Sequence, residues 1–277
     1  MPTASPAVFS PERPPAARGL VCAIHQPNLL PRLSTVAKIL AADVWVVLND
    51  VQFARRDYQH RARIGSLAGD GQARWLTLPT HLPQGRATLI RDARVVDGAL
   101  ARRRIGGILR EQYRSSAGWP VLAERLRPVL ELVETTDRTA AITEASTLML
   151  LDLLGWKGRV LRSSSLSAGH GRTRRLVDLC RAVGATSYLC GTGGARYVEP
   201  DLFSQGGIEL RPFSVPTNGV WAGARTVSAV HPLLVYGTAA IRRGLEAQQH
   251  ANPIEPGAAA VSGGSGARPG RAPWPWP

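Results

Sequence analysis

Residues 20–64 read LVCAIHQPNLLPRLSTVAKILAADVWVVLNDVQFARRDYQHRARI, and this stretch decides the fold. One apolar run covers residues 20–24 and a second covers residues 44–48. Between them, Ser34 is the expected N-cap of a helix whose apolar residues recur at helical spacing. Two continuous apolar strands joined by a helix predict a parallel pair that is buried on both faces, with a right-handed crossover.

Polar residues follow both apolar runs. His25, Gln26 and Asn28 follow the first run, and Asp50 and Gln52 follow the second. Because the carboxyl ends of parallel strands meet at the edge where open α/β sheets bind ligands, we expect these side chains to lie together. We predict His25 as a general base and Asp50 as the acid that orients it, orients an amine or binds Mg²⁺. The competing interpretation is a histidine that caps a strand end and an aspartate that forms a turn.

A basic cluster comes directly after this predicted edge. Its members are Arg55, Tyr58, Arg61 and Arg63. Guanidinium groups bind phosphate or carboxylate through paired hydrogen bonds, so we predict that the cluster holds an anionic substrate. A solvated arginine loop is the alternative.

Two later turns also follow predicted strands. Gly191, Gly193 and Gly194 come after one strand, where backbone N–H groups can approach an anion closely. Ser164 and Ser165 end another strand and can add hydroxyl donors. We predict that all five bind substrate, although plain turn formation explains the glycines equally well.

The rest of the chain alternates between strand and helix patterns. We expect an arginine-rich connection over residues 55–63, and a loop over residues 80–97 with an edge strand within it as the alternative. The expected strands are residues 74–78, 158–162, 187–190 and 208–213, and the expected helices are residues 99–115, 120–134, 138–154, 172–183 and 226–247, the last interrupted near Pro232. This order predicts an α/β fold with a parallel or mixed sheet, helices on both faces, and a mainly helical middle segment. We expect the segment from about residue 99 to about residue 155 to form a helical subdomain.

Composition sets the expected domain limits. The 277 residues are 44% hydrophobic, enough for one α/β domain over residues 20–249. Residues 1–19 and 250–277 are rich in Pro, Ala and Gly and are expected to be disordered. The first twenty residues lack the apolar centre of a signal peptide, and no run reaches eighteen apolar residues, so we expect a cytoplasmic protein without a membrane partner.

The formal net charge of +14 has two explanations. A polyanionic partner such as tRNA is one. The other is base composition, because 32 of the 34 basic residues are arginines that are spread along the chain. We favour base composition. The oligomeric state and any bound metal are not predicted.

Several motifs resemble the WbqC-like protein family. They are IHQPN at residues 24–28, NDVQF at 49–53, YQHRARI at 58–64, WLTLP at 75–79, SSL at 164–166, RLV at 175–177 and GATSYLCG at 184–191. The similarity runs from about residue 21 to 240. Members occur in surface-polysaccharide and O-antigen gene clusters, and some are proposed to transfer glycine or a similar amino acid. The resemblance therefore implies a role in polysaccharide or natural-product biosynthesis.

This sequence departs from the family pattern at positions near the predicted site. Residues 31–35 read PRLST where relatives commonly have PWLGY, Asn49 stands where they carry a second acid, and His231 stands where they usually show an aspartate. These departures imply either a substrate different from that of the glycan-cluster members or a loss of catalysis. From the polar residues at the two strand ends and the family context, we expect a transferase that moves a small acyl or aminoacyl unit to an amine of a nucleotide sugar or related metabolite. Its cofactor is not identified; ATP with Mg²⁺ or an activated acyl donor are candidates. The alternatives are a non-catalytic relative that binds nucleotide or tRNA, and a transferase that depends on aminoacyl-tRNA.

Overall fold

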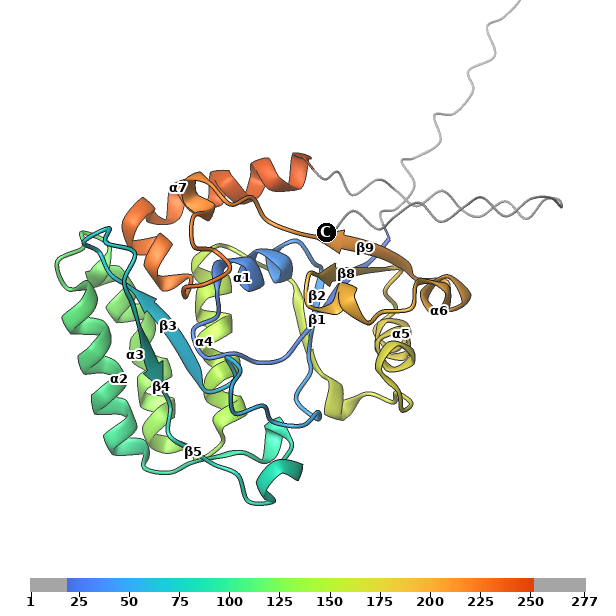
Figure 1. Ribbon diagram of the computed structural model, residues 1–277, viewed down its shortest axis with the longest axis horizontal. Helices are drawn as coiled ribbons and strands as arrows, with labels where there is room; N and C mark the ends of the chain where they lie inside the picture. Colours follow the sequence, from blue (N-terminus) through green and yellow to red (C-terminus); the bar gives the residue numbers. More distant parts are fainter. Residues whose placement is uncertain (1–18, 252–277) are drawn as a thin grey trace, which may run out of the picture.

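A five-stranded parallel sheet forms the main sheet of the protein (Figure 1). The computed structural model describes residues 19–251. The strand order is β7-β2-β1-β8-β9, and every neighbouring pair is parallel. The strands are β1 (Val21–His25), β2 (Val44–Val47), β7 (Arg159–Arg162), β8 (Ser187–Gly191) and β9 (Glu209–Phe213). The predicted α/β fold with a parallel sheet is confirmed.

Helices cover both faces of this sheet, as predicted (Figure 1). Successive residues of a strand point to opposite faces, so Val21 packs in one apolar cluster and Cys22 in another. The first cluster contains residues of α1 (Leu33–Leu40). The second contains residues of α5 (Arg172–Ala182) and of α6 (Pro200–Gln205), a short helix that we did not predict. The continuous apolar character of β1 and β2 follows from this double burial.

The middle of the chain is helical, as predicted. It contains α2 (Gly98–Tyr113), α3 (Trp119–Thr135) and α4 (Thr139–Leu153). Asp97 caps α2 by accepting a hydrogen bond of 2.8 Å from the N–H of Leu100. The buried residues of α2 recur every four positions, at Ala101, Ile105, Leu109 and Tyr113. This spacing places them on one face, which packs in the same apolar cluster as α1 and one face of β1.

Two small antiparallel sheets lie outside the main sheet. One joins β3 (Arg61–Gly65) to β4 (Ala73–Thr77), and the other joins β5 (Thr80–His81) to β6 (Arg94–Val95). The connection predicted over residues 55–63 is therefore wrong at its end, because β3 begins there. In β3 the arginines are partly exposed and the apolar residues are buried, the pattern of a strand with one covered face.

Two helices differ in detail from the prediction. The N-cap of α1 is Arg32, and Ser34 lies inside the helix, so the predicted Ser34 cap is wrong. The last helix, α7 (Val230–Ala251), breaks at Gly237 and not near Pro232. Proline is tolerated in the first turn of a helix, whereas the φ of 78° at Gly237 cannot continue one.

Short 3-10 helices lie in the connections: η1 (Gly85–Ala87), η2 (Ile90–Asp92), η3 (Ser163–Ser165), η4 (Gly194–Arg196) and η5 (Gly219–Trp221). Within residues 19–251, none of the helices combines the length and apolar character that a bilayer crossing requires. The disordered ends predicted for residues 1–19 and 250–277 lie outside the described residues, apart from residues 19, 250 and 251.

Candidate functional site

The order of the strands creates a crevice between β1 and β8. The chain leaves β1 through α1, on one face of the sheet, to reach β2. It reaches β8, on the other side of β1, through α5 on the opposite face. Connections that diverge in this way leave a ligand-binding crevice at the carboxyl ends of the strands. A cavity of about 410 Å³ lies there, with His25 and Gly191 in its lining.

Lys38 and His25 lie side by side in this cavity. Lys38 is on α1, is only 7% exposed, and donates a 3.1 Å hydrogen bond from Nζ to the carbonyl oxygen of Ile24. The same Nζ lies 3.5 Å from Nδ1 of His25. Burial disfavours the charged amine and lowers the pKa of Lys38 to about 8. Lys38 therefore exchanges a proton near neutral pH, as a general base does.

His25 is uncharged at neutral pH. Burial is the main cause, and the neighbouring charges of Lys38 and Arg32 add to it, so the pKa of His25 falls well below its ordinary value. The Lys38 ammonium is only a donor, which favours the tautomer with the hydrogen on Nε2. The Asn28 amide is 3.2 Å from Nε2, and its Oδ1 is buried without a partner. Turning this amide over would let Oδ1 accept the Nε2 hydrogen.

The glycine-rich turn after β8 forms another part of the lining. Gly191, Gly193 and Gly194 all line the cavity, as do Tyr188 and Tyr197. A Cβ at Gly194 would lie 3.1 Å from Sγ of Cys190, so a side chain fits poorly there. The predicted glycines thus lie together at the cavity.

The charge of the cavity is mainly positive. Besides Lys38, its lining includes Arg32 and Arg225, and Asp57 is the single acidic side chain among the lining residues. Arg32 donates a 3.0 Å hydrogen bond to the carbonyl oxygen of Arg225, and its buried Nε has no partner. The site is therefore suited to an anionic ligand.

Asp50 occupies a different position from the one we expected. Its carboxylate accepts a 2.5 Å hydrogen bond from Ser163 and pairs with Arg175 of α5 at 2.6 Å. Burial raises the pKa of Asp50, but the Ser163 and Arg175 interactions together hold it below its usual range. Both carboxylate oxygens are thus engaged away from His25, and Asp50 is absent from the lining of the cavity. Among the described residues, no three His, Cys, Asp or Glu side chains form a group that could hold a metal ion.

Of the other predicted polar residues, Gln26 lines the cavity, and Asn28, Gln52, Ser164 and Ser165 do not. Gln26 lines it, and its Oε1 accepts a 2.8 Å hydrogen bond from Gln59. Gln52 instead donates to the carbonyl oxygen of Arg86. Ser164 and Ser165 belong to η3 and are absent from the lining.

The predicted basic cluster does not line the cavity. Tyr58 packs beneath Arg32, which is itself a lining residue. Arg61 and Arg63 project from β3 toward Trp75, and Arg55 is exposed in the preceding loop. None of these four residues lines the cavity, and Tyr58 is connected to it through its contact with Arg32.

The sequence analysis missed Lys38, Arg32, Arg225, Tyr188 and Tyr197 as site residues. Lys38 had a usable signal, because it interrupts the apolar sequence of α1 in a chain that contains only two lysines. The two tyrosines and Arg225 reach the cavity through long-range packing, for which the sequence carries no local signal.

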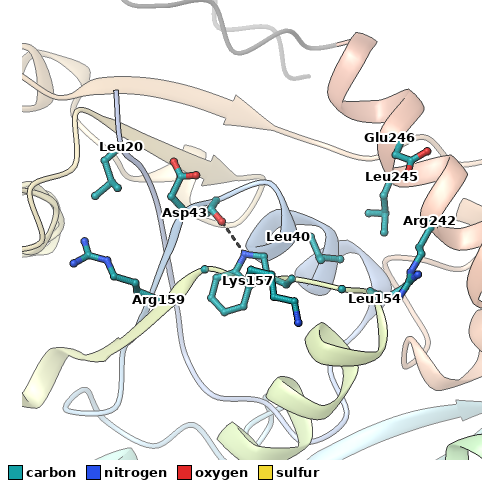
Figure 2. Close-up of a pocket in the computed structure, with 13 residues that line it drawn as sticks. Leu20, Leu40, Asp43, Leu154, Lys157, Arg159, Arg242, Leu245 and Glu246 are labelled. Atoms are coloured by element: carbon teal, nitrogen blue, oxygen red, sulfur yellow. Dashed lines mark hydrogen bonds between the residues drawn. The ribbon is translucent and has the colours of Figure 1, made fainter. Parts of the chain in front are cut away.

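A second and larger cavity, of about 740 Å³, lies at the opposite edge of the sheet (Figure 2). Asp43 and Arg159 border it near the starts of β2 and β7, and Arg242 and Glu246 border it from α7. Parallel sheets bind ligands at the carboxyl ends of their strands, and this cavity is at the amino ends. We therefore place the candidate site in the smaller cavity.

A family model described as the WbqC-like protein family matches residues 26–229. The chain belongs to the WbqC-like protein family. This WbqC-like protein is also similar to an uncharacterized protein of Mycobacterium tuberculosis, Rv1507c, with 26% identity over 191 residues, 69% of this chain and 80% of the relative. No solved structure matches it. The family match extends from the residue after His25 past Arg225, so it includes most of the cavity lining.

Proposed function

We propose that this WbqC-like protein transfers a small acyl or aminoacyl unit to an amine of an anionic acceptor, such as a nucleotide sugar. The observation that carries the proposal is the buried Lys38 amine beside an uncharged His25, in a mainly cationic cavity at the carboxyl edge of the sheet. This arrangement supplies a base near neutral pH next to a place where an anion binds.

The proposed step forms one bond and breaks one. The neutral acceptor amine attacks the carbonyl carbon of the donor, and a C–N bond forms while the bond to the donor's leaving group breaks. The amine loses a proton to Nζ of neutral Lys38, and the leaving group departs with the electron pair and takes up that proton. His25, through Nδ1, positions Nζ. Lys38 thus takes the role that the sequence suggested for His25.

Asp50 has an indirect role in this proposal. It holds Arg175 and Ser163 at the ends of β2 and β7, and thereby positions α5 against the sheet. The donor is an activated acyl compound, because an amine readily displaces the group on a carbonyl carbon only when that group is a good leaving group. A thioester, an aminoacyl-tRNA ester and an intermediate made with ATP and Mg²⁺ all satisfy this requirement.

The test is an assay of amide formation. Purified protein is incubated with acyl thioesters or aminoacyl-tRNA and with amino-sugar nucleotides, and the product is detected by mass spectrometry. We expect Lys38→Met to reduce the rate by about 10²- to 10⁴-fold, the usual effect of removing a general base. Lys157→Met is the matched control, because Lys157 is the other lysine of the chain and borders the opposite cavity. Equal rates in the wild type and Lys38→Met would contradict the proposed role.

A second candidate function is binding without chemistry. It is favoured by Arg32, which replaces the tryptophan common in relatives and whose guanidinium bonds to the chain at Arg225. Thermal-shift measurements with nucleotides separate the two functions. A binding protein would be stabilised by a nucleotide and yield no amide with any donor, whereas an enzyme would be stabilised and would also yield the amide.

A further inference from the structure

Two arginine and two aromatic side chains contact one another in series beside the cavity, and the two rings are tilted by 46°. The guanidinium of Arg32 lies 4.2 Å from the ring centre of Tyr58. The rings of Tyr58 and Trp75 are 5.7 Å apart, and the guanidinium of Arg61 lies 4.1 Å from the Trp75 ring. We call Arg32, Tyr58, Trp75 and Arg61 the stacked platform. Its order of cation, ring, ring and cation is maintained by cation–π and aromatic contacts.

The fold holds the platform in place. Arg61 donates hydrogen bonds to the carbonyl oxygens of Arg56, at 2.5 Å, and Asp57, at 3.3 Å. Trp75 is opposite Arg63 in the β3–β4 pair, on the face of the hairpin that is not buried. Trp75 is nevertheless 44% exposed, which is unusual for the largest apolar side chain. Arg61 covers one face of the Trp75 ring and holds it in place, so this exposed side chain requires little ordering when a planar ligand binds.

The platform continues into the candidate site. Arg32 belongs to both, because it stacks on Tyr58 and also lines the cavity. Asp57, the residue before Tyr58, lines the cavity as well. A ligand that lies on the rings can therefore extend toward Lys38 without leaving the protein surface.

The charges around the platform favour phosphate. Arg55 and Arg56 are exposed in the loop beside it, and Arg63 lies 6.0 Å from the Trp75 ring. Within residues 19–251, none of Arg32, Arg55, Arg56, Arg61 or Arg63 forms a salt bridge with a carboxylate. Their positive charge is therefore available to an anion.

We propose that the stacked platform binds a nucleobase on the exposed ring of Trp75, with Tyr58 beside it, the attached phosphates on the surrounding arginines and the reactive end of the ligand in the cavity. The inference rests on the proposed function and names its substrate class. Stacking of a base on an aromatic side chain contributes about 1–3 kcal/mol, and guanidinium groups bind phosphate in two-pronged geometry. A free nucleotide, as in a nucleotide sugar, and the 3′ end of an RNA both offer this chemistry.

Calorimetric titration of the full chain tests the proposal. The probes are UDP, AMP and a single-stranded RNA oligonucleotide that ends in CCA. We expect at least one probe to bind, and Trp75→Ala to weaken that binding by tenfold or more. We expect Arg61→Met to weaken binding and to reduce its dependence on salt. Tyr236→Ala and Arg104→Ala are matched controls, because both residues are exposed and lie on helices α7 and α2, outside the platform.

The relative affinities of the three probes identify the molecule that carries the base. Tighter binding of UDP or AMP indicates a nucleotide ligand, and tighter binding of the oligonucleotide indicates an RNA end. The proposal is overturned if no probe binds at millimolar concentration, or if Trp75→Ala and the wild type bind equally. The titration measures binding without turnover, so its result does not depend on whether the proposed transferase function is correct. If the Lys38→Met protein kept both its nucleotide affinity and its full turnover, the proposed role of Lys38 would be contradicted, and the proposal for the platform would still stand.

Discussion

At the scale of single residues, Lys38 determines what the site can do. Because only Lys38 and Lys157 are lysines, protein labelled with [ε-¹³C]lysine yields two side-chain signals in an NMR titration. We expect one signal to titrate at about pH 8, since burial disfavours the charged amine of Lys38. Any amide-forming activity should rise with pH through the same range, because only the neutral amine accepts a proton. Two signals that titrate together near pH 10.4, the ordinary value for lysine, would contradict this prediction.

Asp50 is the second residue whose partners can be tested. Asp50→Ala leaves the partly buried Arg175 without its carboxylate, and we expect a loss of about 2 kcal/mol in the free energy of unfolding at pH 7. Asp152→Ala is the control, because the Arg125–Asp152 pair is exposed and such pairs contribute at most about 1 kcal/mol. Urea denaturation of the three proteins measures both losses.

The pH dependence of the Asp50 effect has a defined sign. The folded-state pKa of Asp50 is lower than the unfolded value of about 3.9. Its contribution to stability is therefore fully present above that unfolded value and is lost as the pH falls through the folded-state pKa. The difference between wild type and Asp50→Ala should shrink below about pH 4. A difference that grows on acidification would show that the carboxylate does not stabilise the folded state.

At the scale of elements, the break in α7 depends on one glycine. Gly237 has a φ of 78°, in the region that a side chain disfavours, and a Cβ there would meet no atom within 4 Å. With a ψ of 156°, Gly237 lies in a region that is essentially restricted to glycine, so Gly237→Ala should destabilise the protein by about 1–3 kcal/mol through backbone strain alone. Gly107→Ala is the matched control: Gly107 lies inside α2, and its Cβ also meets nothing within 4 Å. This change should stabilise by up to about 1 kcal/mol, because alanine favours helix. Equal effects of the two changes in thermal or urea unfolding would refute the strain at Gly237.

At the scale of the whole molecule, the two cavities lie at opposite edges of one sheet, and only one of them leads to Lys38. A Cβ at Gly191 would lie 3.6 Å from Cδ of Lys38, so Gly191→Val should cover the amine. We expect Gly191→Val to slow the modification of Lys38 by trinitrobenzenesulfonate at pH 8 several-fold, as measured by mass spectrometry. Arg242→Trp, in the larger cavity, should leave the rate unchanged. Equal rates in all three proteins would mean that Lys38 is reached from elsewhere.

Local sequence patterns predicted most of the elements. The runs that became β1 and β2 are apolar because both faces of these strands are buried, and that feature is visible in a few consecutive residues. The helices of the middle segment were visible for a similar reason, since their buried residues repeat at helical spacing. The sequence analysis predicted β4 but missed β3. The arginines of β3 are typical of a loop, and their contacts with Trp75 across the hairpin are visible only in the structure.

The sequence by itself determined the α/β class, the family and the presence of polar residues at the strand ends, because these depend on periodicity and on contiguous motifs. Only the tertiary structure decided which of those residues meet. It placed β8 beside β1, paired Asp50 with Arg175 across 125 positions of sequence, and brought the amine of Lys38 against His25. Strand order and side-chain pairing depend on contacts between distant segments, and burial of an amine depends on everything that packs around it. Neither is encoded in any short stretch of the chain.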